Sequence, residues 1–197
     1  MFPNQLNVIE IKLPEWIDSF LLGYPGFLSS IEDRMSFVIE AAHLNVSNAT
    51  GGPFAAAIFE TESGKLVSLG VNLVTSVGLS ILHAEMVAFA FAQKKIGSYD
   101  LGRYDLPAHE LVTSIEPCAM CYGAIPWSGV RRVIIGARDS DARRIGFDEG
   151  PKMRDWKDEL KKRGIETICD VKREAAAQVL LDYSLQGGKI YNSRESG

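Results

Sequence analysis

The sequence predicts an α/β fold, a three-layer α/β/α sandwich around a mixed sheet of about five strands. Short apolar or β-branched runs alternate along the chain with longer segments of helical pattern. The first two runs, residues 53–61 and 65–72, are joined by Glu62-Ser63-Gly64, which indicates an antiparallel hairpin. The later runs are separated by helical segments, and such a crossover connects parallel strands with a right-handed sense. Because both kinds of connection occur, the predicted sheet is mixed.

Two helices are predicted in the first half of the chain. Ser30 is a helix-capping residue with Asp33 at the third helical position, so a helix is expected from residue 31 to about residue 45. Ser80 is expected to cap a second helix, which ends at Gly97. This second helix is apolar on nearly every side, which is typical of a helix at the centre of a protein.

Strands and helices alternate in the second half of the chain. Pro117 and Pro151 are each expected at the first position of a helix, where proline has no N–H to lose. Residues 130–137 are apolar and β-branched, which is typical of a strand buried on both faces. Gly164 ends one helix and Asp170 caps the last one. The predicted strands are 111–115, 130–137 and 165–169, and the predicted helices are 117–127, 151–164 and 170–188.

The element pattern divides the chain into three parts. Residues 30–188 form the predicted domain, preceded by an N-terminal extension of residues 1–29 and followed by a tail of residues 189–197. Within the extension, residues 8–13 alternate like an edge strand, and Pro14 begins a short helix. The extension is expected to pack against the domain or to form a dimer arm. The polar tail is expected to act as a lid.

Bulk composition excludes several classes of protein. A chain of 197 residues is long enough for one domain with a sizeable core, and no stretch approaches the roughly 20 apolar residues of a membrane span. The net charge of −4 counts against nucleic-acid binding, which usually requires a basic domain. The N-terminus lacks a basic region followed by an apolar run, so no secretory signal is expected. Three cysteines argue against a disulfide framework and for a reducing compartment, the cytoplasm.

Two short motifs together supply the ligands of a catalytic zinc ion. Cys118 and Cys121 are three residues apart, so on a helix they share one face and can bind the same ion. The helix dipole at the preceding Pro117 favours their thiolate forms. His83 is a third ligand, and three protein ligands leave the fourth tetrahedral position for a water with a pKa of about 7. Glu85, two residues after His83, is placed to move the protons of that water.

Simpler interpretations of these motifs remain open. A Cys-x-x-Cys pair alone also occurs in structural zinc sites and in redox motifs. A structural site usually has four Cys or His ligands, and the other candidates, Cys169, His43 and His109, do not lie in a paired motif. A redox site would not need His83-Ala84-Glu85. The sequence therefore predicts one zinc ion per chain in an open, catalytic site.

Residues 31–188 resemble the cytidine deaminase-like fold, in the branch that holds guanine deaminases and tRNA adenosine deaminases. The His-x-Glu and Pro-Cys-x-x-Cys pattern is the signature of zinc deaminases. The resemblance implies that His83, Cys118 and Cys121 bind zinc, that Glu85 moves protons, and that Asn72 hydrogen-bonds the base. The resemblance is carried by Gly51-Gly52-Pro53-Phe54, by His83-Ala84-Glu85 and by Glu116-Pro117-Cys118-Ala119-Met120-Cys121-Tyr122-Gly123-Ala124-Ile125.

The substrate is implied by residues that follow the two cysteines. Trp127 and the sequence Gly146-Phe147-Asp148-Glu149 resemble those of small bacterial guanine deaminases. In those enzymes an acidic residue after Gly-Phe-Asp contacts guanine, and the usual residue there resembles aspartate. Glu149 keeps the charge but has a longer reach, so an amino-triazine such as ammeline is a second expected substrate. The resemblance assigns further base contacts to Phe54, Asn72, Ala84, Trp127 and Phe147.

The implied activity is zinc-dependent conversion of guanine to xanthine and ammonia. Glu85 would pass a proton from water to the base, and Glu85 or Glu149 would protonate the leaving amine. The first alternative is the editing of adenosine to inosine in tRNA, which the acidic composition disfavours. The second is a non-catalytic zinc-binding protein, which Glu85 disfavours because a structural site gains nothing from an unliganded carboxylate.

The resemblance also implies an assembly. Relatives in this branch are commonly homodimers, and some guanine deaminases exchange C-terminal segments so that one chain covers the site of the other. We therefore expect a homodimer in which the tail closes over a bound nucleobase. The sequence leaves open whether the tail and Glu149 act in their own chain or in the partner.

Overall fold

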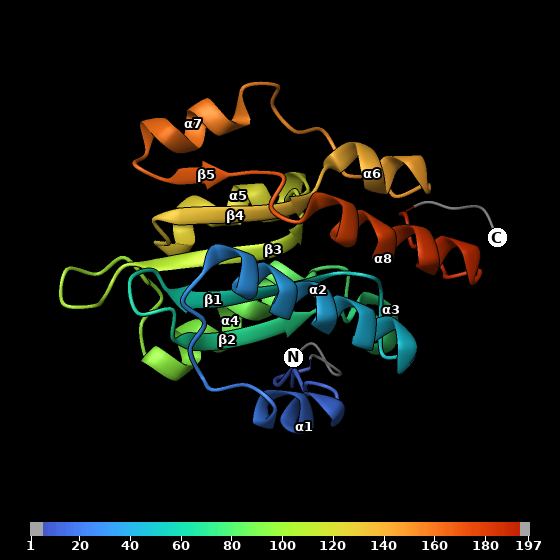
Figure 1. Cartoon of the computed structure of the whole chain (residues 1–197), viewed down its shortest axis with the longest axis horizontal. Coiled ribbons are helices and arrows are strands. Elements are labelled where there is room, and N and C mark those ends of the chain that lie inside the picture. The colour runs from blue at the N-terminus through green and yellow to red at the C-terminus, as the bar shows by residue number, and fades with distance from the viewer. Residues whose placement is uncertain (1–5, 194–197) are drawn as a thin grey trace, which may run out of the picture.

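Five strands form one mixed sheet within residues 6–193, the part of the chain that the computed structural model describes (Figure 1). Their order across the sheet is β2-β1-β3-β4-β5. β1 is antiparallel to both β2 and β3, whereas β3, β4 and β5 are mutually parallel. The predicted mixed sheet and its initial hairpin are confirmed. The strands are β1 (Ala55–Glu60), β2 (Leu66–Val71), β3 (His109–Ile115), β4 (Arg132–Ala137) and β5 (Glu166–Ile168).

Helices cover both faces of this sheet, which confirms the three-layer sandwich. α2 and α8 lie on one face, and α4 and α5 lie on the other (Figure 1). No helix in residues 6–193 combines the length and the apolar character needed to cross a membrane. The helices are α1 (Trp16–Leu22), α2 (Ile31–Ser47), α3 (Val74–Val77), α4 (Ala84–Ile96), α5 (Ala119–Ser128), α6 (Asp139–Arg144), α7 (Trp156–Lys162) and α8 (Arg173–Leu185).

Successive side chains of β1 belong to two different apolar clusters, one on each face of the sheet. Ala56 and Ile58 belong to the cluster that contains residues of α4, whereas Ala57 and Phe59 belong to the cluster that contains residues of α2. Successive side chains of a strand point to opposite faces, so this central strand contributes to both layers.

The first residue of α4 differs from the prediction. His83, with an extended ψ of 155°, is the N-cap of α4, and Ser80 lies in the turn before it. A turn at residues 80–81 and a backbone bond from Leu73 N to Leu82 O (3.0 Å) hold Leu82 beside the end of β2, so the chain becomes helical only after residue 83. α4 ends at Gly97, as predicted, with a left-handed φ of +74°. The N-cap at Ser30 is also confirmed, because the Asp33 N–H donates to its Oγ over 3.0 Å.

Gly70 allows α4 to lie directly on β2. A Cβ atom at Gly70 would lie 2.3 Å from the Ala84 carbonyl oxygen and 2.4 Å from the Ala88 nitrogen. Real Cβ atoms do not approach backbone atoms so closely, so only glycine permits this contact. The contact places the N-terminal end of α4, and with it His83, against the sheet.

Three helix starts in the second half of the chain were predicted wrongly. Pro117 precedes the N-cap of α5, which is Cys118. Pro151 does not begin a helix, because Lys152 bonds to residues before α5 and the chain becomes helical only at Trp156. Asp170 does not cap α8, since its carboxylate pairs with Arg138 and the N-cap is Lys172. The short helix α6 was not predicted.

The described part of the N-terminal extension packs on α2. Phe20 stacks on Phe37 with ring centroids 5.0 Å apart, and Ile17 is buried. The predicted helix after Pro14 is therefore present as α1. The predicted edge strand at residues 8–13 is wrong, because this segment forms no strand. The dimer-arm role of the extension stays a prediction, and residues 1–5 lie outside the described chain.

Candidate metal centre and active site

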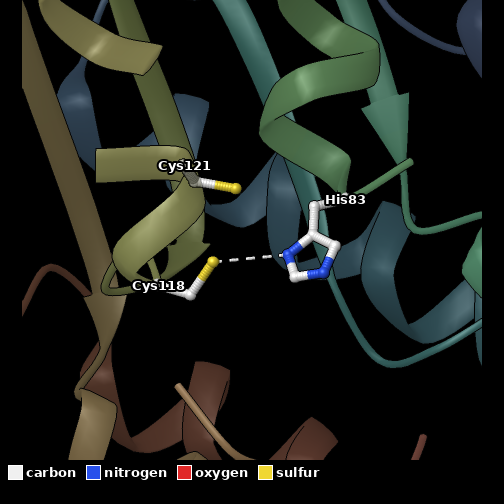
Figure 2. A group of neighbouring side chains, drawn as sticks. All are labelled: His83, Cys118 and Cys121. Carbon is white, nitrogen blue, oxygen red and sulfur yellow. Dashed lines mark hydrogen bonds between the residues drawn. The ribbon is translucent and has the colours of Figure 1, made fainter. Parts of the chain in front are cut away.

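Three potential metal ligands meet between the N-terminal ends of α4 and α5. His83 and Cys118 are the N-caps of these helices, and Cys121 is buried in the first turn of α5. Figure 2 shows the Cys118 sulfur facing the His83 ring, with Sγ 3.4 Å from Nδ1. The ligand atoms of all three residues lie within 4.8 Å of one another. Tetrahedral zinc, with bonds of about 2.0–2.3 Å, holds such atoms roughly 3.5 Å apart. The donor set and its spacing therefore fit zinc.

The sheet topology brings the separate parts of this site together. The segment containing Cys118 leaves the carboxyl end of β3, and the loop containing Glu149 follows the carboxyl end of β4 after α6. Because β3 and β4 are parallel and adjacent, these ends meet at one edge of the sheet. Residues far apart in sequence thus reach the same site.

Hydrogen bonds between the three metal ligands shift their pKa values. A hydrogen bond with Cys121, helped by His83 and opposed by burial, lowers the pKa of the Cys118 thiol to about 4. The same hydrogen bond and burial raise the pKa of Cys121 well above its usual value. Burial lowers the pKa of His83, but the hydrogen bond to the Cys118 sulfur and the nearby charges of Cys118, Glu85 and Glu149 together raise it above its usual value. Because metal ligands bind in their deprotonated forms, these pKa shifts make Cys118 the thiol that gives up its proton more readily than Cys121.

Two carboxyl groups are buried beside these ligands. Glu85 and Glu149 are 4% and 7% exposed. Burial, with the nearby Cys118 thiolate and Glu85, raises the pKa of Glu149 to about 8. Burial and the Cys118 thiolate also raise the pKa of Glu85. A carboxyl group that exchanges its proton near neutral pH is suited to general acid–base chemistry.

A cavity of about 390 Å³ opens beside the metal ligands, and its size suits a small ligand. The predicted site residues that line it are Phe54, Asn72, His83, Glu85, Cys118, Phe147 and Glu149. Cys121 does not line the cavity, but its sulfur lies within 4.8 Å of the ligand atoms of His83 and Cys118. Residues that were not individually predicted as site residues also line it: Val74, Ser80, Ile115, Ala119, Met120, Asp148, Gly150, Tyr191, Asn192 and Ser193.

Asn72 is held rigidly at the end of β2. It is 1% exposed, its N–H donates to the Phe54 carbonyl over 3.0 Å, and its own carbonyl accepts from Asn45 Nδ2 over 2.9 Å. Its Oδ1 accepts from the Val74 N–H over 3.2 Å. Phe54 and Phe147 meet edge to face at 5.0 Å and form an apolar part of the cavity wall.

Two predicted substrate contacts lie outside this cavity. Trp127 is 84% exposed and lines a separate groove with Arg131 and Arg163. It lies six residues after Cys121, and six residues are one and two-thirds helical turns, so it faces a different side of α5. Its ring therefore does not line this cavity, and its contact with a base stays a prediction. Ala84 is buried under Gly70 and does not line the cavity.

The histidine and cysteine residues outside the paired motifs have other surroundings. His109 is 1% exposed and its Nδ1 lies 2.7 Å from the Leu101 carbonyl oxygen, which is a structural contact. His43 is exposed, and Cys169 is half-buried beside the apolar core. Neither lines the cavity, in agreement with the prediction that they are not ligands.

The described part of the C-terminal tail reaches the cavity of its own chain. The side chain of Asn192 accepts from the Asp148 N–H and donates to the Gly146 carbonyl, each over 2.8 Å. These bonds bring Tyr191 and Ser193 into the lining. The sequence suggested a lid but no particular residue, because a polar tail carries no periodic signal. Residues 194–197 of the tail lie outside the described chain, and exchange between protomers stays a prediction.

The sequence of this chain is similar to those of known zinc-dependent deaminases. A model of the cytidine and deoxycytidylate deaminase zinc-binding region matches residues 28–137. The guanine deaminase of Bacillus subtilis is 38% identical over 104 residues, which cover 53% of this chain and only 62% of that enzyme.

Solved structures extend the similarity to nearly the whole chain. The structure of guanine deaminase from Nitrosomonas europaea has a TM-score of 0.87 and 42% identity, covering 92% of this chain and 99% of that one. A structure in complex with 2,6-diaminopurine has a TM-score of 0.86 and 44% identity, covering 94% and 97% of the two chains. With its zinc-binding triad and five-stranded sheet, the chain belongs to the cytidine deaminase-like family of zinc-dependent deaminases, in the branch that includes guanine deaminases.

Proposed function

We propose that this protein deaminates a free nucleobase by hydrolysis, converting guanine and water to xanthine and ammonia. The observation that carries the proposal is a base-sized cavity lined by two of the three metal ligands and two buried carboxyl groups, Glu85 and Glu149. Similarity to a guanine deaminase at 42% identity over 92% of this chain supports the choice of guanine.

Zinc, held by His83, Cys118 and Cys121, would supply a Lewis acid that activates water near neutral pH. Glu85 takes one proton from the attacking water and delivers it to N3 of the base, while the oxygen forms a bond to C2. The bond from C2 to the amino nitrogen then breaks as the new hydroxyl group on C2 loses its proton and becomes a carbonyl, and the nitrogen leaves as ammonia after it accepts a second proton. Glu85 is suited to both transfers because burial raises its pKa.

Glu149 is proposed to contact the base and to be the alternative to Glu85 as donor of the second proton. Burial raises its pKa to about 8, so it carries a proton at neutral pH that it can donate to the leaving amine. Asn72 offers an amide donor and acceptor to the purine edge. Phe54 and Phe147 are proposed to exclude water from one side of the ring.

The proposal also covers the metabolic role, the cellular compartment and the oligomeric state of the enzyme. The reaction serves purine catabolism, because it removes the exocyclic amine of a free base. Cys118, Cys121 and Cys169 form no disulfide, which fits the reducing cytoplasm. We also propose a homodimer, in which the tail closes over the bound base, either in its own chain or in the partner's.

The test is ammonia release by the zinc-loaded protein from guanine, ammeline, adenine, cytosine, cytidine and a tRNA anticodon stem-loop. We expect turnover of guanine, with ammeline as the second substrate. Glu62→Gln, which changes an exposed turn residue, is the control for carboxyl substitutions. Turnover of the stem-loop without turnover of free bases would favour tRNA editing, and no turnover of any substrate would favour a non-catalytic zinc protein.

A further inference from the structure

Lys152 has a buried ammonium group between two segments of the site. Its side chain is 7% exposed, and Nζ donates to the Glu116 carboxylate over 2.6 Å and to the Pro117 carbonyl over 2.8 Å. A carboxylate oxygen of Asp139 lies 3.4 Å from the same nitrogen. The ring of Trp156 covers the ammonium at 5.1 Å. An ammonium group has three N–H donors, and three protein oxygens surround this one.

These partners connect the two parts of the site. Pro117 directly precedes the metal ligand Cys118, and Lys152 lies three residues after Glu149. The same loop is held from its other side by Arg143, whose Nη2 donates to the Gly150 carbonyl over 3.1 Å. The Lys152 side chain therefore joins the segment that carries a metal ligand to the segment that carries a buried carboxyl group.

We propose that Lys152 is a positioning residue, which holds Glu149 at a fixed distance from the metal ligands. The inference rests on the proposed role of Glu149 in deamination. An ammonium buried in this way is stable only with its partners in place, so it resists displacement of the loop. Catalytic groups lose effect steeply with displacement, by about 10²-fold for a shift of about 1 Å. Lys152 thus acts on the reaction through Glu149, without touching the base.

The first test compares steady-state kinetics on guanine. Lys152→Met keeps the length of the side chain and its contact with Trp156 but removes all three donors. We expect kcat to fall on the order of 10- to 100-fold, with a smaller change in KM and unchanged zinc content. Lys152→Arg, which keeps the charge and the donors, should recover most of the activity. Lys157→Met is the matched control, because Lys157 contacts the same Trp156 ring at 5.4 Å from an exposed position.

A double-mutant cycle separates positioning from a general loss of stability. If Lys152 acts through Glu149, Lys152→Met should have little further effect on kcat in a Glu149→Gln background. The same fold loss in both backgrounds would overturn the proposal.

The second test does not depend on activity. Amide hydrogen exchange of residues 146–152 in the zinc-loaded protein should accelerate in Lys152→Met and stay unchanged in Lys157→Met. Unchanged exchange in Lys152→Met would overturn the role of Lys152. Absence of guanine turnover in the wild-type protein would instead contradict the proposed function, so the two failures are distinguishable.

Discussion

Ala119 donates its backbone N–H to the carbonyl oxygen of Glu149 over 2.9 Å. This bond joins the first residue of α5, next to the metal ligand Cys118, to the loop after α6. Gly150 permits the approach, because a Cβ there would lie 3.0 Å from the Ala119 Cβ and its φ of +69° is left-handed. A main-chain bond and the Lys152 side chain therefore hold the same two segments together.

The composition of the metal site gives the first prediction. We expect about one zinc per chain in the purified protein. Cys118→Ser should lose most of the zinc, because a neutral hydroxyl replaces the thiolate that already forms at neutral pH. Metal analysis by plasma mass spectrometry measures both proteins, with Cys169→Ser as the control. Full zinc content in Cys118→Ser would contradict the ligand set.

Glu85→Gln tests the division between metal binding and proton transfer. Glu85 lies outside the ligand group, so the variant should keep its zinc and still bind 8-azaguanine in a calorimetric titration. Turnover of guanine should fall by at least about 10²–10⁴-fold, as is typical of losing a general acid–base group. A Glu85→Gln protein that retains activity would exclude the proposed mechanism.

Substitutions of Glu149 test whether this residue contacts the base and influences the choice of substrate. Glu149→Gln should lower guanine turnover strongly with little change in zinc content or thermal stability, because the amide resembles the protonated carboxyl that burial favours at neutral pH. Glu149→Asp should shift the ratio of guanine to ammeline turnover, since a site that hydrogen-bonds its substrate is sensitive to displacements of about 1 Å. Equal kinetics for the three proteins would place Glu149 outside the reaction.

Asp141, which lies outside the cavity, is expected to make the free energy of unfolding depend on pH. Burial alone would raise the pKa of Asp141, but bonds from Arg173 and the Arg138 N–H outweigh it and hold the pKa below 3.8. The unfolded state therefore binds more protons, and the stabilisation is complete above pH 3.8 and lost as pH falls below it.

Denaturant unfolding of the metal-free protein measures this effect. Asp141→Asn should lose about 1.5–3 kcal/mol at pH 7, the usual contribution of hydrogen bonds to a charged group. The difference from wild type should shrink below pH 3.8. Glu174→Gln, an exposed change on the same helix as Arg173, should show no difference at either pH. A constant difference across this range would contradict the assignment.

The assembly prediction concerns the homodimer. Small-angle scattering at micromolar concentration should give the mass of two chains, and addition of 8-azaguanine should slow hydrogen exchange in the described tail residues 189–193. A fully active monomer would contradict the dimer. Asn192→Ala should weaken closure of the tail, because it removes both bonds to the loop at residues 146–148.

Local sequence determined the elements whose signals lie within a few residues. The Ser30 cap, the hairpin and the spacing of Cys118 and Cys121 each depend on contacts between near neighbours, and the structure has all three. The zinc ligands were predictable for the same reason, since one turn of α5 and one end of α4 supply them. Alternating strands and helices were then sufficient to predict the sandwich.

Tertiary structure alone decided which other residues join the site. Lys152 bonds to Glu116 across 36 positions, and Asn192 bonds to Asp148 across 44, so no local pattern indicates either contact. The bonds of Lys152 also explain why no helix begins at Pro151. Trp127 has the residue type and spacing of a base contact, but the turn of α5 directs it to solvent. The side of a helix that faces the site and the polar bonds between distant residues are determined only when the elements pack. The reason is that the free energy of each contact depends on partners that the sheet brings together.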